Sequence, residues 1–314
     1  MLFPLASAAK EPVTGRHAMV VAQEPLAAAV GIEILKLGGN AVDAAVAVGF
    51  ALAVTHPSAG NIGGGGFMLV RLADGKSYFI DFREEAPEKA THDMYVGPDG
   101  KPTKDSLVGW RASGVPGSVK GFEAASKKWG TMKWPRLLEP AVHLARDGFR
   151  VDKTLARELQ SPHSTLSKDP ESTRIFLRDG NPYQAGEIFR QPELAATLER
   201  IAVHGSAEFY SGETAQKLAS AMKEHGGLIT LADLENYRAI DRTPLEGDYR
   251  GYHIITAPPP SAGGVGILQM MGMLSGTGYN TDGPDSTKAV HYMAEAMRRF
   301  YADRSEYLGD PDFY

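Results

Sequence analysis

The tetrapeptide Asp81-Phe82-Arg83-Glu84 is the part of the sequence best suited to bind an anion. It places an arginine at the end of a mainly apolar segment, with a carboxylate on either side. The guanidinium of Arg83 is a rigid set of donors that suits bidentate capture of a carboxylate. The tetrapeptide alone also allows a simpler interpretation, which is an ion pair at a strand end. The candidate partners for that ion pair are Asp81, Glu84 and Glu85.

Four consecutive glycines, residues 63–66, precede this tetrapeptide. A phosphate-binding P-loop would need Gly-Lys-Ser/Thr leading into a helix, and a dinucleotide site would need G-x-G-x-x-G between a strand and a helix. These glycines instead follow a predicted helix and precede a predicted strand, and no lysine follows them. They are better explained as positions where two backbones approach closely or where φ is positive. We therefore expect no nucleotide cofactor.

The histidines and serines show no arrangement typical of a metal site or a serine nucleophile. None of the nine histidines forms an H-x-x-x-H or H-x-H pair, so no metal site is expected. No serine lies in the G-x-S-x-G sequence of an α/β-hydrolase. Cysteine is absent, which excludes disulfides, thiolate nucleophiles and Cys-ligated zinc. We expect the protein to need no cofactor.

Composition narrows the class of protein further. The chain has 314 residues, of which 43% are hydrophobic and 23% are charged, as is ordinary for a globular protein. Its formal net charge is −5 and its basic residues are scattered, so a nucleic-acid partner is not expected. No apolar run reaches the ~18 residues of a membrane span, and none is expected.

The N-terminus contains small residues of the kind that precede a signal-peptidase site. It lacks the basic region and the full apolar region of a signal peptide. It is either a remnant of an export signal or an unremarkable chain end. We expect residues 1–15 to be a flexible segment.

Two consecutive helices are predicted ahead of the glycine run. Residues 24–37 show apolar positions at helical spacing, and Gly38-Gly39 supplies a left-handed C-cap. Asn40 then caps a second helix over residues 41–54. Asp43 is the only charge in that second helix, which is apolar almost all round. Such a helix is buried on several sides, which favours a layered architecture.

The glycine run leads into a predicted β-hairpin with strands over residues 67–72 and 77–82 and a turn at Asp74-Gly75. A later strand is predicted over residues 249–257. Further helices are predicted over residues 118–129, 135–147, 192–204, 213–224, 231–237, 263–274 and 285–307. No repeat or linker-like stretch interrupts the chain. We therefore predict a single domain over residues 1–314.

Taken in order, these segments resemble the large, N-terminal subunit of γ-glutamyltransferases (γ-glutamyltranspeptidases, glutathione hydrolases). Residues 61–67 match the family's N-x-G-G-G-G-F stretch, and residues 81–84 match its D-F-R-E motif. The other matches are residues 38–47, 55–57, 113–117, 144–149, 227–230, 248–252, 258–264, 302–304 and 309–311. The glycine run alone would be a weak indication. The ordered set is specific and covers nearly the whole chain.

The resemblance implies an α+β fold, the αββα sandwich of the N-terminal-nucleophile hydrolases, completed by a small subunit that is not in this chain. It implies a precursor that cuts itself into a large and a small subunit. The new N-terminal threonine of the small subunit acts as nucleophile and, through its α-amine, as base. The implied enzyme cleaves γ-glutamyl amides such as glutathione and its conjugates. It transfers the γ-glutamyl group to water, amino acids or peptides.

The resemblance places no catalytic residue in this chain. In the family the nucleophile lies in a Thr-Thr-His-(Phe/Tyr) sequence, and this chain has no Thr-Thr pair. Thr91-His92 follows the D-F-R-E motif, in a stretch that belongs well upstream of the processing site. Most substrate-binding residues of the family lie in the small subunit. Only the arginine of D-F-R-E transfers, to Arg83, which the resemblance assigns to the α-carboxylate of the substrate.

Two other functions stay open. A related acylase of the same superfamily, such as one that cleaves glutaryl amides of β-lactams, would share the fold and the processing. A non-catalytic homologue would lack the Thr-Thr-His-(Phe/Tyr) sequence in the rest of its gene. The location follows only from the resemblance: bacterial members are usually periplasmic or secreted, and we expect the same of this protein.

Overall fold

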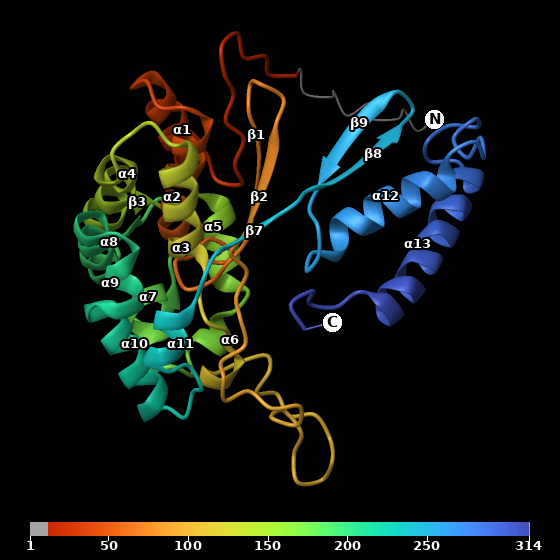
Figure 1. Cartoon of the computed structure of the whole chain (residues 1–314). Coiled ribbons are helices and arrows are strands. Elements are labelled where there is room, and N and C mark those ends of the chain that lie inside the picture. Colours follow the sequence, from red (N-terminus) through yellow and green to blue (C-terminus); the bar gives the residue numbers. More distant parts are fainter. Residues whose placement is uncertain (1–11, 314) are drawn as a thin grey trace, which may run out of the picture. The chain divides into compact units, whose positions relative to one another are not determined.

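The computed structural model describes residues 12–313 (Figure 1). The chain divides into two compact units. The first unit contains residues up to 62 and residues 125–214, and the second contains residues 63–124 and those from 215 onward. The expectation of a single domain over residues 1–314 stays a prediction. Most of the segment expected to be flexible, residues 1–15, lies outside the described residues. No helix within residues 12–313 is both long enough and apolar enough to cross a membrane.

Two helices begin the first unit, as the sequence predicts. Helix α1 spans Pro25–Lys36 and helix α2 spans Ala41–Thr55. Gly38 follows α1 with a φ of 90°, a left-handed conformation that glycine adopts without steric cost. Eleven of the fifteen residues of α2 are buried. This burial confirms that α2 is covered on several sides.

Helix α2 packs against α4 (Trp134–Asp147), and α4 packs against α8 (Pro192–His204) (Figure 1). Trp134 joins these three helices. Its ring meets the ring of Phe50 edge-on, at a centroid distance of 5.5 Å. Its indole N–H donates to the carbonyl of Ile201 at 2.9 Å. The indole thus gains apolar contact and a hydrogen-bond partner together, as this side chain requires in a core.

Short elements connect these helices in the described part of the first unit. Their lengths are too small for periodicity to show in the sequence, and the sequence analysis does not predict them. They are α5 (Lys153–Gln160), α6 (His163–Leu166), α7 (Pro170–Phe176), α9 (Ser206–Ser211), β3 (Phe149–Arg150) paired with β6 (Ile188–Phe189), and β4 (Leu177–Arg178) paired with β5 (Asn181–Pro182). Helices α3 (Ser118–Trp129) and α10 (Glu213–Glu224) match their predicted ranges.

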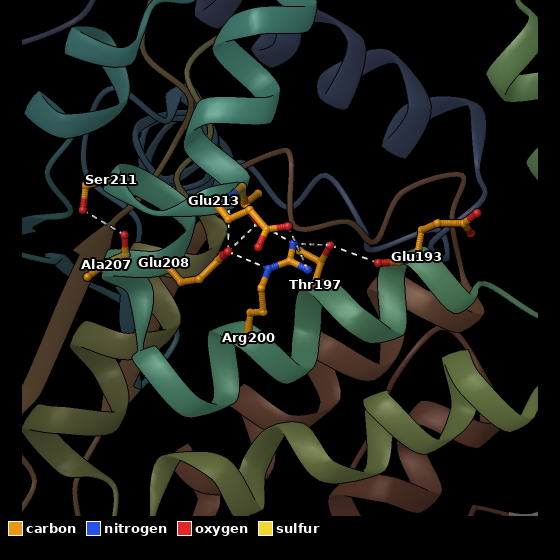
Figure 2. A network of polar contacts seen from close by, with 8 residues as sticks. Glu193, Thr197, Arg200, Ala207, Glu208, Ser211 and Glu213 are labelled. Atoms are coloured by element: carbon orange, nitrogen blue, oxygen red, sulfur yellow. Dashed lines mark hydrogen bonds and ion pairs between the residues drawn. The ribbon is translucent and has the colours of Figure 1, made fainter.

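A buried ion pair ties α8 to α9 and to the first turn of α10 (Figure 2). The Glu208 side chain is only 4% exposed, and its Oε1 accepts a hydrogen bond from Nε of Arg200 at 2.8 Å. The same oxygen accepts from the backbone N–H and the hydroxyl of Thr214, at 3.1 and 3.0 Å. Thr197 accepts from the guanidinium on its other side at 3.2 Å. Because a buried carboxylate needs a charged partner and hydrogen bonds, these contacts hold α8, α9 and Thr214 together within the first unit.

The second unit contains a three-stranded antiparallel sheet with β2 in the middle. Strands β1 (Phe67–Arg71) and β2 (Ser77–Asp81) form the predicted hairpin. Gly75 turns this hairpin with a φ of 87°. Strand β7 (Ile240–Arg242) pairs with the other edge of β2, so that Ile240 lies opposite Asp81. The end of β2 is therefore fixed from both sides.

The sequence predicts one strand over residues 249–257, but the structure has two strands and a turn. Strands β8 (Leu245–Tyr249) and β9 (Tyr252–Thr256) form an antiparallel hairpin. Arg250 and Gly251 turn it with φ angles of 51° and 83°. A two-residue turn of this hand matches the twist of the strands. Arginine rarely adopts a positive φ, so the residue types do not indicate the turn.

Helices complete the second unit at the predicted places. They are α11 (Leu231–Asn236), α12 (Ala262–Leu274) and α13 (Thr287–Tyr307), with a short 3-10 turn at Trp110–Ala112. Helix α12 packs against β8 and against α13. The β8–β9 hairpin, α12 and α13 thus form one packed group. The loop between β9 and α12, residues 257–261, leads to the cavity described below.

The carboxylate of Asp43 fixes the start of α2 in the first unit. It is fully buried, and its Oδ2 accepts the backbone N–H of Asn40 at 2.9 Å, which completes a capping box. Thr131 donates its backbone N–H and its hydroxyl to the carboxylate, and the N–H of Met132 donates at 3.2 Å. Burial raises the pKa of Asp43, but these hydrogen bonds outweigh burial and lower the pKa below its ordinary value.

We expect Asp43→Asn to lower the free energy of unfolding by about 1–3 kcal/mol at pH 7, because the amide sets a donor against backbone donors. A carboxyl with a lowered folded pKa contributes stability above its unfolded pKa of about 3.9 and loses it as pH falls through the folded pKa. The deficit should therefore shrink below about pH 4. Thermal melts at pH 7 and below about pH 4 measure the deficit. Asp74→Asn, in the exposed β1–β2 turn, is the control. An equal deficit at both would contradict a role for the charge.

Candidate functional site

Arg83 lies two residues beyond the end of β2, at a cavity of the second unit. The cavity measures about 400 Å³ and is lined by the end of β2 and by parts of residues 237–242, 259–262 and 304–312. The side chain of Arg83 is exposed, and its Nη1 lies 3.5 Å from the carbonyl oxygen of Pro260. A cavity of this size suits a small ligand held by a few polar groups.

The strand-end ion pair that the sequence also allows for Arg83 is not found among the described residues. Asp81 instead accepts a hydrogen bond from Nε of Arg242 at 2.7 Å. Arg242 also donates to both carboxylate oxygens of Asp312, at 3.1 and 2.7 Å. The hydrogen bond to Asp312 is the largest cause of a raised pKa at Arg242, and Asp81 adds to it against desolvation. The guanidinium of Arg83 thus stays available for an anionic group of a ligand.

The backbone of Arg83 is held by two buried side chains. Its N–H donates to Oδ1 of Asp81 at 3.0 Å. Its carbonyl oxygen accepts from the hydroxyl of Tyr237 at 2.8 Å. Asp81 is 6% exposed and Tyr237 is 1% exposed. The exposed side chain of Arg83 therefore extends from a backbone that is held at both its N–H and its carbonyl oxygen.

The glycine run lies directly against this backbone. A methyl group added at Gly65 would lie 2.5 Å from the carbonyl oxygen of Phe82 and 2.7 Å from the backbone nitrogen of Glu84. Gly66 exchanges two backbone hydrogen bonds with Phe82, at 3.2 and 3.0 Å. None of the glycines at 63–66, all of them described, has a positive φ. Close approach of two backbones therefore accounts for Gly65, and positive φ accounts for none of the four glycines.

Carboxylates share the cavity with the arginines, and one of them has a raised pKa. Desolvation in the cavity is the largest cause of the raised pKa of Glu85. Three nearby carboxylates also raise it, those of Asp310, Asp312 and Asp81. Arg238 acts in the opposite direction. As pH falls, Glu85 therefore takes up a proton before an ordinary glutamate does, which reduces the negative charge in the cavity that Arg83 lines.

Thr91, His92 and Ser261 are of types that could act as nucleophile or metal ligand. Thr91 and His92 are exposed and do not line the cavity. Ser261 does line it, but its hydroxyl accepts the backbone N–H of Gly263 at 3.4 Å and caps α12. Within residues 12–313 no group of three His, Asp or Glu side chains is arranged to hold a metal ion. That no cofactor is needed stays a prediction.

Reasoning from sequence identifies Arg83 but misses the residues that surround it. Tyr237 and Arg242 are separated from Arg83 and Asp81 by 154 and 161 residues, and local spacing does not connect them. A partial signal was present in the resemblance. Besides residues 81–84, three of its matching segments, residues 258–264, 302–304 and 309–311, supply part of the cavity lining.

Comparisons with known proteins agree along most of the chain. A family model described as gamma-glutamyltranspeptidase matches residues 27–314. The glutathione hydrolase proenzyme of Escherichia coli is 50% identical over 304 residues, which cover 96% of this chain and 52% of that protein. An acylase ACY 1 proenzyme from a Pseudomonas species is 43% identical over 97% of this chain and 56% of that protein. The solved γ-glutamyltranspeptidase of Helicobacter pylori has a TM-score of 0.94 at 43% identity, over 96% of this chain and 88% of that chain.

The structural likeness confirms the predicted α+β fold and places the chain in the class of N-terminal-nucleophile hydrolases. Within that class, the chain belongs to the γ-glutamyltranspeptidase family, as its sequence motifs predict. It spans about half the length of the curated relatives it matches.

A substitution at Gly117 tests how far the structure around the cavity depends on close packing. A methyl group at this position would collide with the carbonyl of Phe82 and the hydroxyl of Tyr237. We expect Gly117→Ala to lower the free energy of unfolding by about 1–3 kcal/mol. Gly272 in α12 has no heavy atom within 4 Å of such a methyl group. Gly272→Ala should therefore stabilise the chain by about 0.5–1 kcal/mol through helix propensity. Denaturant titrations measure both, and a stable Gly117→Ala variant would show that the contact relaxes.

Proposed function

We propose that this chain is the large-subunit portion of a γ-glutamyltransferase and glutathione hydrolase. The enzyme cleaves γ-glutamyl amides, such as glutathione and its conjugates, and passes the γ-glutamyl group to water, amino acids or peptides. Family membership and relatives named glutathione hydrolase proenzyme support this. The observation that carries it is the guanidinium of Arg83, which has no carboxylate partner among the described residues and lines a cavity of about 400 Å³.

Arg83 binds the α-carboxylate of the γ-glutamyl group in this proposal. The planar guanidinium can donate two parallel hydrogen bonds to a carboxylate, which fixes the orientation of the ligand as well as its position. The α-carboxylate lies several bonds away from the amide that is cleaved. The contact is therefore present in both the bound substrate and the transition state, and it contributes mainly to binding.

The nucleophile is proposed to lie on a partner subunit cut from the same precursor, since this chain has no Thr-Thr pair. The hydroxyl of the partner's N-terminal threonine attacks the γ-glutamyl carbonyl while its α-amine takes up the hydroxyl proton. The C–N bond then breaks, the leaving amine receives that proton, and an ester remains. Water or an acceptor amine attacks the ester and restores the threonine. An α-amine with an ordinary pKa of about 7.7–8.0 suits this role as base.

Substitution of Arg83 tests the proposal directly. We expect Arg83→Lys and Arg83→Ala to fold and mature, because the guanidinium is exposed and pairs with no carboxylate among the described residues. Truncation of a charged pair costs about 2–5 kcal/mol. At ~1.4 kcal/mol per factor of ten, kcat/KM for a γ-glutamyl anilide should fall by two to three orders of magnitude, mostly through KM. Steady-state kinetics with thermal melts measure this.

Arg71→Lys is the matched control for these variants. Arg71 is exposed at the end of β1 and does not line the cavity, so its kinetics should equal those of the unmodified enzyme. A strand-end structural role for Arg83 would instead give a lower melting temperature or a smaller yield of matured enzyme, with a normal KM in the fraction that matures. An unchanged KM in Arg83→Lys and Arg83→Ala would remove Arg83 from the substrate site.

The division of labour between subunits gives a second test. We expect this chain alone to have no γ-glutamyl hydrolase activity, because nucleophile and base lie on the partner. Activity should require a threonine-initiated polypeptide, which intact mass spectrometry detects in the purified enzyme. Activity in a sample that lacks such a polypeptide would contradict the proposal.

A related acylase is the second candidate function, and the 43% identity to the acylase ACY 1 proenzyme favours keeping it. Glutaryl and γ-glutamyl groups share the carboxylate that Arg83 would bind, and they differ in the α-amino group. Competition between γ-glutamyl and glutaryl anilides separates the two functions. A preference for glutaryl would assign the chain to the acylases.

The remaining proposals depend on the rest of the gene and on its cellular context. A non-catalytic homologue would lack the Thr-Thr-His-(Phe/Tyr) sequence beyond the part given by this chain, and the gene sequence decides this. We propose a periplasmic or secreted location, which rests on the resemblance to bacterial members. Cell fractionation with an antibody to the chain tests it.

A further inference from the structure

We propose that Asp81 and Tyr237 are positioning residues for Arg83, and that through it they select acyl groups that carry a carboxylate. The inference rests on the proposed function, since it takes Arg83 as the group that binds the substrate's carboxylate. Neither side chain needs to touch the substrate for this role. Each acts on the backbone from which the guanidinium extends.

The two contacts hold Arg83 at opposite ends of its backbone. The carboxylate of Asp81 accepts the N–H at 3.0 Å, and the hydroxyl of Tyr237 donates to the carbonyl oxygen at 2.8 Å. Both groups are at least nine-tenths buried. Buried hydrogen bonds of this kind are costly to break, because the groups left behind find no water.

These bonds occupy a place where no strand ladder continues. Strand β2 ends at Asp81, and after it Phe82 still pairs with Gly66 while Glu85 pairs with Val115. Arg83 lies between these pairs, and its N–H and carbonyl bond to side chains instead. Without those side chains the residue would lose the two bonds that define its orientation.

A second layer keeps Asp81 in place. Its Oδ2 accepts Nε of Arg242 at 2.7 Å, and Arg242 is held by two hydrogen bonds to Asp312. Asp81 is therefore fixed, with Oδ1 directed to Arg83. Gly65 and Gly117 add packing, since the Phe82–Arg83 backbone lies too close to either glycine for a methyl group to fit between them.

Fixing the backbone matters because the proposed contact is directional. A bidentate guanidinium–carboxylate pair needs both groups in one plane, and a long side chain on a mobile backbone seldom presents that geometry. A misplacement of about 1 Å can cost about a hundredfold in rate. The effect should fall only on substrates that carry the carboxylate, and this separates positioning from a general loss of structure.

The test uses the mature two-subunit enzyme and three anilide substrates. γ-Glutamyl and glutaryl anilides carry the carboxylate, and 4-aminobutyryl anilide lacks it. We expect Tyr237→Phe to lower kcat/KM for the first two by about tenfold, which corresponds to one lost hydrogen bond of about 1.4 kcal/mol. The slow turnover of 4-aminobutyryl anilide, followed at high enzyme concentration, should stay unchanged.

Tyr95→Phe is the matched control. The Tyr95 hydroxyl also donates to an arginine carbonyl, that of Arg111 at 2.9 Å, and neither residue lines the cavity. Its removal should leave the rates of all three substrates unchanged. If Tyr237→Phe fails to fold, Asp81→Asn replaces it: the amide oxygen can still accept the N–H of Arg83, while the charge that holds Arg242 is lost. The same substrate pattern is expected, with a smaller effect.

The outcomes separate this inference from the proposed function. Equal losses on all three substrates, or no loss on any, would overturn the positioning role. In an Arg83→Lys background, Tyr237→Phe should add little on γ-glutamyl anilide, because the contact it serves is already gone. Full additivity there would also overturn it. If Arg83→Lys lowers kcat/KM no more for the substrates with a carboxylate than for 4-aminobutyryl anilide, the proposed function fails instead.

Discussion

The wall of the cavity depends on a close approach of backbone segments that only glycine permits. Gly65 and Gly117 each face Phe82 at a distance where a methyl group would collide with its carbonyl oxygen. The backbone at Phe82 is therefore closely packed along its path beyond β2. The polar backbone groups on that path must still be satisfied, and at Arg83 the side chains of Asp81 and Tyr237 do this.

Two arginines that line the cavity, Arg242 and Arg83, have different roles. The Arg242 side chain is 13% exposed, and its donors are occupied by Asp81 and Asp312. Arg83 is exposed and pairs with no carboxylate among the described residues. An arginine whose donors are already used stabilises the structure around it, whereas one with unused donors can bind an anion. Because Asp81 and Asp312 pair with Arg242, Arg83 is the arginine that remains available for the proposed ligand.

Each unit also contains a buried carboxylate at the end of an element, and the two are stabilised differently. Asp43 is held by neutral donors, which are backbone N–H groups and the hydroxyl of Thr131. Asp81 is held by the guanidinium of Arg242. Either solution avoids the cost of an unpaired buried charge. Neutral donors suit a helix start that only needs a fixed position, whereas the ion pair at Asp81 also joins β2 to β7 and to the C-terminal residues.

Local patterns in the sequence determined α2, through its cap at Asn40, and the β1–β2 hairpin, through the glycine at its turn. They failed at β8, because the turn at Arg250 uses a residue that rarely adopts a positive φ. The sequence also identified Arg83, since a guanidinium beside a strand end has a definite chemistry. It could not show that Arg83, rather than Arg242, is available to bind an anionic ligand. The partners of Arg242 lie 161 and 70 residues away, and only the packing of the second unit brings them together.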